Sequence, residues 1–84
     1  MKSATFELPN GKATFTLWAH ADGREVLALR DATGDYPTEA SHGWTADYTS
    51  LPADADEAAD LLARLDWCPD FDALRREGFA SAGY

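Results

Sequence analysis

The sequence predicts an α+β fold in which an antiparallel sheet of three to four strands precedes two C-terminal helices, both packed on one face of the sheet. Two observations support this order of β-β-β-β-α-α. Two glycine-containing turns, at 10–11 and 21–23, separate stretches in which apolar and polar residues alternate. Apolar residues then recur with helical spacing after residue 54. The 84 residues suffice for one modest hydrophobic core, so we expect a single domain over 1–84.

The first hairpin is expected to turn at Asn10-Gly11, because both central residues of a type I′ turn need a positive φ. A two-residue loop there pairs Leu8 with Ala13 and Phe6 with Phe15. The apolar residues of both strands then share one face of the sheet, and the threonines take the other.

The second hairpin is expected to have a three-residue loop, Ala21–Gly23, with its glycine in the left-handed position of a G1 bulge. This loop pairs Leu17 with Leu27 on the core face. A two-residue loop would turn the leucines of the third strand outward, so the longer loop is favoured. It leaves Trp18 opposite Val26 on the outer face.

The stretch 31–43 is rich in turn-forming residues, and we expect a loop there with a helical turn near 38–42. Residues 44–49 alternate between apolar and polar types, which is typical of a half-buried fourth strand. Whether this strand borders the third or the first stays open.

The first helix is expected to start at Asp54, with Glu57 three residues later in a pattern close to a capping box. One apolar stripe then follows at i, i+3, i+4 and i+7, formed by Ala58, Leu61, Leu62 and Leu65.

A second, shorter helix is expected from Asp70 to Glu77. Pro69 suits its beginning, and Gly78 suits a left-handed residue after its end. Phe79 can then fold back on Leu74, as in a Schellman motif.

The charge of the chain is strongly asymmetric. The net charge is −8, and the 26 residues from Asp47 to Asp72 hold eight acids against one base, Arg64. The remaining 58 residues carry seven acids and six bases. The eight acids of this stretch are the candidate partner-binding residues: Asp47, Asp54, Asp56, Glu57, Asp60, Asp66, Asp70 and Asp72.

Local structure accounts for most of these acids taken singly. Carboxylates are favoured at helix N-termini, and Asp60 can pair with Arg64 one turn later. Asp47 and Asp66 have no such role. Like charges about 8 Å apart in water repel by roughly 0.5 kcal/mol per pair, so their accumulation is not required for stability. Two interpretations remain open: a solvated acidic face, or a surface that binds a basic partner.

In size and charge, the chain resembles small acidic inhibitors, often encoded by phages, among which DNA-mimicking anti-CRISPR proteins are the best fit. The resemblance extends over the whole chain and involves no sequence motif. It implies a non-enzymatic inhibitor that binds the basic DNA- or PAM-reading surface of a Cas effector complex. Immunity proteins and antitoxins that neutralise nuclease toxins share these features and remain an alternative. Another is a phage structural module that oligomerises through Trp18 and Val26.

Catalytic and metal sites are disfavoured by the spacing of the candidate ligands. A calcium loop that starts at Asp54 needs glycine where Ala59 stands and glutamate where Leu65 stands. The two histidines and the single cysteine lack the spacing of a zinc site. We therefore expect no catalytic residues, no metal and no cofactor.

The composition also bears on partners and location. An excess of acids disfavours direct binding to nucleic acid or anionic lipid, since phosphate binding draws on lysine and arginine. No apolar run approaches 18 residues, and no secretory leader is evident at the N-terminus. Cys68 cannot form an internal disulfide, which fits a reducing compartment. We expect a cytoplasmic protein of a bacterial host, monomeric rather than oligomeric.

Overall fold

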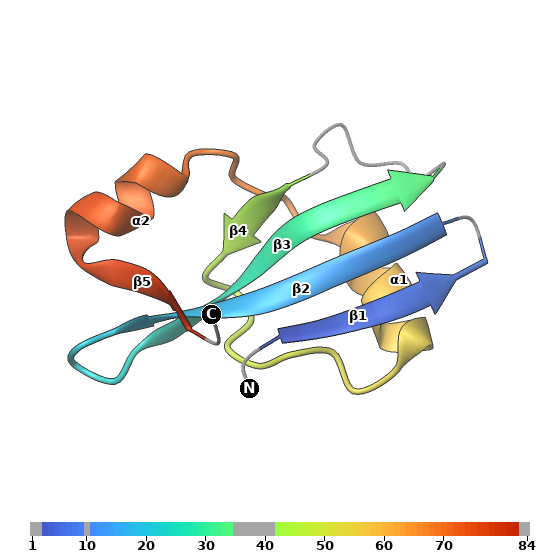
Figure 1. Ribbon diagram of the computed structural model, residues 1–84, viewed down its shortest axis with the longest axis horizontal. Coiled ribbons are helices and arrows are strands. Elements are labelled where there is room, and N and C mark those ends of the chain that lie inside the picture. The colour runs from blue at the N-terminus through green and yellow to red at the C-terminus, as the bar shows by residue number, and fades with distance from the viewer. Residues whose placement is uncertain (1–2, 10, 35–41, 83–84) are drawn as a thin grey trace.

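The computed structural model describes residues 3–9, 11–34 and 42–82. Its elements confirm the α+β class with helices toward the C-terminal end (Figure 1). In chain order they are β1 (Ser3–Leu8), β2 (Gly11–His20), β3 (Glu25–Gly34), β4 (Gly43–Thr45), α1 (Ala55–Arg64), α2 (Phe71–Glu77) and β5 (Phe79–Ala82).

The sheet has five strands in the order β1-β2-β3-β4, with β5 also paired to β2. The fourth strand therefore borders the third, which settles the order left open by the sequence. β1 pairs with residues 11–16 of β2 and β5 with residues 17–20, so the two strands lie end to end along one edge of β2. The strand β5 was not expected from the sequence.

The first hairpin forms, but its predicted register is wrong by two residues. Leu8 pairs with Gly11, so the chain turns one residue earlier than the predicted Asn10-Gly11 loop, and Asn10 itself lies outside the described residues. The predicted loop would have placed Pro9 directly before its first residue, in the strand position opposite Lys12. Proline has no N–H to donate there, whereas it is favoured as the second residue of a turn that ends in glycine. A shift of two residues keeps every side chain on its predicted face.

The second hairpin is confirmed with its three-residue loop. Leu17 pairs with Leu27, and Trp18 pairs with Val26. The amide of Gly23 donates to the carbonyl of His20 over 2.9 Å, and Gly23 has a φ of +98°, the left-handed conformation that favours glycine.

The predicted loop over 31–43 is partly wrong, because β3 continues to Gly34. Its pairing with β2 shifts between Thr14, which pairs with Asp31, and Phe15, which pairs with Leu29, and this bulge lets the strand continue in a new register. The helical turn expected near 38–42 falls almost wholly outside the described residues. The fourth strand is shorter than predicted, Gly43–Thr45, and the hydroxyl of Thr45 then accepts a hydrogen bond from the amide of Asp47.

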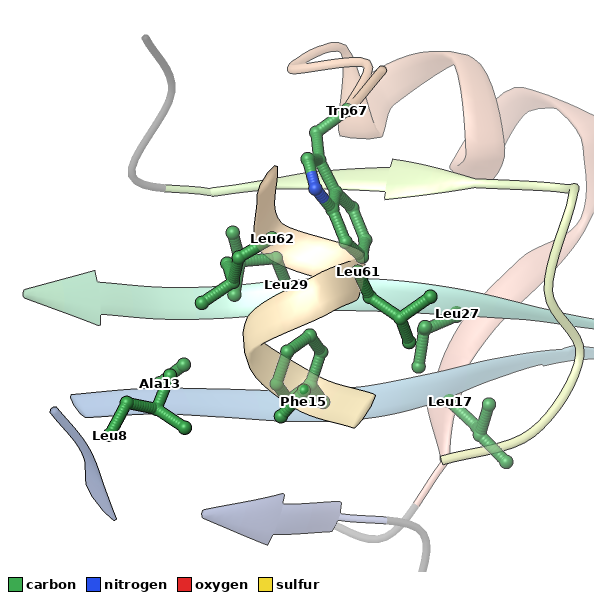
Figure 2. Packing of buried hydrophobic residues seen from close by; sticks show 10 residues of the cluster. Leu8, Ala13, Phe15, Leu17, Leu27, Leu29, Leu61, Leu62 and Trp67 are labelled. Atoms are coloured by element: carbon green, nitrogen blue, oxygen red, sulfur yellow. The ribbon is translucent and has the colours of Figure 1, made fainter. Parts of the chain in front are cut away.

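The main core lies between α1 and one face of the sheet (Figure 2). Leu61 and Leu62 point from the helix toward Phe15 of β2 and toward Leu27 and Leu29 of β3. All five side chains are fully buried. Burying each contributes about 1.5–3 kcal/mol, and this stabilisation fixes which side of α1 remains in solvent.

A second, smaller core lies on the opposite face, under α2. Leu74 of α2 packs with Val26 and Phe79, and half-buried Trp18 and Phe71 flank them. Trp18 and Val26 belong to the face of β2 and β3 that alternates with the leucine face. The expectation that both helices cover one face is therefore corrected: they enclose the sheet from its two sides. Trp18 and Val26 would expose apolar surface on this face, and α2 covers them.

The connection between the helices passes the edge of β4. Trp67 is buried in the main core, while the next residue, Cys68, exchanges two backbone hydrogen bonds of 2.9 Å with Trp44. The indole Nε1 of Trp44 donates to the carbonyl of Asp70 over 2.9 Å. A Cβ added to Gly43 would lie 2.7 Å from the Cβ of Trp67, so this close crossing depends on a glycine.

The second helix ends as the sequence predicts. Gly78 has a φ of +104°, and its N–H bonds to carbonyls of the last turn. His20 holds this end to the hairpin: its Nδ1 accepts from the amide of Asp22 over 3.0 Å, which leaves Nε2 to donate to the carbonyl of Glu77 over 2.9 Å. We call the face of the sheet that α2 covers the second face. The hydrogen bonds of His20 link the end of α2 on this face to the loop between β2 and β3.

Candidate functional site

Helix α1 turns a row of carboxylates toward solvent. Since Ala58, Leu61 and Leu62 are buried against the sheet, the residues half a turn away must point outward. Asp56 and Asp60 occupy that outer side, and both are exposed. They stand four residues apart, about 6 Å along the helix axis, so their charges are neighbours.

The N-terminus of α1 explains a second part of the negative charge. Asp54 is the N-cap residue, and its Oδ1 accepts a hydrogen bond of 2.8 Å from the amide of Glu57. This confirms the predicted cap. Asp56 and Glu57 in the first turn also lie where the helix dipole favours negative charge, by about 0.3–1 kcal/mol each.

Arg64, at the C-terminal end of α1, compensates the negative charge of one acid on this helix. Its guanidinium pairs with Asp60 at 3.0 Å, as the i, i+4 spacing predicts, and it also donates to the hydroxyl of Tyr48 over 3.1 Å. The hydrogen bond to Tyr48, followed by that to Asp60, raises the pKa of Arg64 above its ordinary value. Because Tyr48 packs against the main core, this contact brings the segment that contains Asp47 beside the C-terminal end of α1.

Several other acids on or near α1 take part in no ion pair within the described part of the chain. Among the ion pairs of the described residues, none includes Asp47, Asp56, Glu57 or Asp66. All of these except the half-buried Glu57 are exposed. We call the following six residues the α1 acidic surface: Asp47, Asp54, Asp56, Glu57, Asp60 and Asp66. The stretch 47–66 has a net charge of −5.

The two remaining candidate residues lie elsewhere. Asp70 and Asp72 belong to α2, on the other face of the sheet. Asp70 caps α2 by accepting from the amide of Ala73 over 3.1 Å, and it lies 3.6 Å from Arg76. Asp72 pairs with Arg75 at 2.8 Å. The predicted set of eight therefore divides into six acids on the side of α1 and two that arginines of their own helix compensate.

The second face holds features that the sequence reading missed. Two hollows flank α2, and they are lined by the aromatic side chains Trp44 and Phe79 in one case and Trp18 and Phe71 in the other. The available signal was the apolar character of Trp18 and Val26 on the outer face of the second hairpin.

The described residues contain neither a metal-binding cluster nor a membrane-spanning helix. No group of three or more histidine, cysteine, aspartate or glutamate side chains is arranged there to hold a metal ion. Nor is any helix in the described ranges long and apolar enough to cross a membrane.

No protein family, curated protein or solved structure was found to match this chain.

Proposed function

We propose that this domain is a non-enzymatic inhibitor that binds a basic, nucleic-acid-binding surface of another protein through the α1 acidic surface. The observation that carries the proposal is the difference between the helices. On α2 arginines compensate Asp70 and Asp72, whereas near α1 Asp47, Asp56 and Asp66 have no ion pair among the described residues. Uncompensated exposed carboxylates attract a cationic surface and steer its approach.

A Cas effector complex is the target class that the size and charge of the chain favour. A groove that binds DNA phosphates presents lysine and arginine side chains, and a domain that occupies it excludes DNA. A nuclease toxin offers the same kind of surface and is the second candidate. An oligomerising module based on Trp18 and Val26 has less support, because Val26 is buried under α2 and Trp18 lies against Phe71.

The test compares two triple variants with the same total charge. One reverses Asp56, Asp60 and Asp66 to lysine on the α1 acidic surface. The matched control reverses three exposed acids outside it, namely Glu7, Asp72 and Glu77. Both variants change the net charge from −8 to −2, so a difference between them reports the position of the charges and not their sum.

The assay measures release of a fluorescent DNA duplex from a purified Cas effector complex, followed by fluorescence anisotropy. We expect the wild-type domain and the control variant to release DNA, and the α1 variant to need at least about tenfold more protein, roughly 1.4 kcal/mol. Inhibition should weaken between about 0.05 M and about 0.5 M salt, as the Debye length shortens from roughly 14 Å to roughly 4 Å. Release from a nuclease toxin alone would select the second candidate. Equal loss in both variants, or no effect on either protein, would overturn the proposal.

A further inference from the structure

A hollow of about 390 Å³ opens on the second face, between α2 and the edge formed by β3 and β4. Its floor is apolar and consists of Val26, Leu74 and Phe79, all buried. Half-buried Trp44 lines one side and is held in place by the hydrogen bond from its Nε1 to Asp70. The volume lies within the range of small-ligand sites, so the hollow can take one large side chain.

The rim of this hollow carries negative charge. Glu25 of β3 and Glu77 at the end of α2 both line it. Glu77 is exposed, and no ion pair among the described residues includes it. An apolar floor beneath carboxylates suits a ligand with an apolar stem and a cationic end.

Within the chain, one guanidinium already lies over the Phe79 ring in the floor of this hollow. Arg24, also on the rim, holds its guanidinium carbon 5.3 Å from the centre of the Phe79 ring, within the range of a cation–π contact. Its Nε donates to Asp22 over 2.7 Å. Because Asp22 compensates the charge of Arg24, that arginine does not cancel the carboxylate of Glu77.

We propose that this hollow binds an arginine side chain of a partner protein. The aliphatic stem lies on Val26 and Leu74, and the guanidinium lies between the ring of Trp44 and the carboxylate of Glu77. Lysine is the poorer occupant, since its ammonium group has no planar surface to stack on an indole. The hollow and the α1 acidic surface lie on opposite faces of the sheet, so this site is independent of the proposed function.

The test is a titration of the ¹⁵N-labelled domain with a blocked Gly-Arg-Gly peptide, followed by NMR. The control peptide carries citrulline, which keeps the shape of arginine and removes its charge. The arginine peptide is expected to shift the indole N–H of Trp44 and the amides of Val26 and Phe79, and to bind about two- to fivefold more tightly than the citrulline peptide. Glu77→Gln should weaken the arginine peptide by a similar factor. The matched variant Glu7→Gln, exposed on β1, should not.

Three outcomes would overturn the proposal: equal binding of the two peptides, no effect of Glu77→Gln, or shifts confined to α1. The last would show that the peptide is attracted by the α1 acidic surface alone. The variant with Asp56, Asp60 and Asp66 reversed to lysine separates the two ideas, because it leaves the hollow intact. Binding at Trp44 should persist in that variant even where inhibition of a DNA-binding protein is lost.

Discussion

Replacing Leu74 with alanine is expected to lower the free energy of unfolding by about 2–3 kcal/mol. Leu74 is 1% exposed and packs with Val26 and Phe79 beneath α2. Substitutions of this kind in protein cores cost about 2–5 kcal/mol, the larger values where a closed cavity remains. Leu74 also lines the solvent-open hollow, so water can enter the vacated space and the cavity contribution is small. A domain of 84 residues is stable by about 4–13 kcal/mol, so the loss is a large part of the total.

Urea unfolding measures this loss, and an unchanged m-value would show that the unfolding reaction stays the same. NMR spectra of the folded variant should show shifts at Val26 and Phe79, with Phe15 on the other face little affected. The control is Leu65→Ala, at a half-buried leucine on the edge of the main core, for which we expect a smaller loss. A loss below about 1 kcal/mol for Leu74→Ala, or shifts centred on Phe15, would refute the placement of α2 on the second face.

Three further predictions concern caps and turns. Asp54→Ala should cost about 1 kcal/mol in urea unfolding because it removes the N-cap hydrogen bond, while Asp54→Ser should retain most of the stability. Gly78→Ala should destabilise more than Gly23→Ala. Both glycines have a positive φ, but an added Cβ at Gly78 would lie 2.9 Å from an imidazole nitrogen, and at Gly23 it would meet nothing within 4 Å; equal melting temperatures would contradict this. The pKa of Asp22 is lowered below its ordinary value of 3.8, chiefly by the hydrogen bond from the amide of Arg24. Its contribution to stability is therefore present above pH 3.8 and lost as the pH falls through the lower folded-state value, which an NMR titration of the carboxyl group would show.

Local signals in the sequence predicted the elements well. The N-cap at Asp54 and the left-handed Gly78 each depend on a few adjacent residues, and both are confirmed. The loop length of the second hairpin was predicted from the requirement that Leu27 face the core, and the observed pairing of Leu17 with Leu27 confirms it. The predicted register of the first hairpin was wrong because it was based on the Asn10-Gly11 turn signal and neglected the missing N–H of Pro9.

Tertiary arrangement was harder to predict. The apolar residues of α2, such as Leu74, are compatible with either face of the sheet, so helical periodicity could not place it. Two alanines among the four residues of β5 weaken its strand signal, and β5 forms because the ten-residue β2 extends beyond β1. The candidate site shows the same limit. Exposure of the acids follows from helical periodicity. The separation of Asp70 and Asp72 from the six residues of the α1 acidic surface depends instead on how the connection between α1 and α2 crosses the edge of β4.

The central strand β2 has consequences for the order of folding. The first three strands join sequence neighbours through short turns and can assemble early, since little loop entropy opposes them. One edge of the stretch Leu17–His20 then remains unpaired until β5, which is distant in the sequence, forms its hydrogen bonds with it. Detachment of β5 would reopen that edge and offer an unpaired backbone to other molecules. Hydrogen exchange should therefore be fastest, within the sheet, for the amides that β5 protects, and conditions that release β5 should promote aggregation before global unfolding.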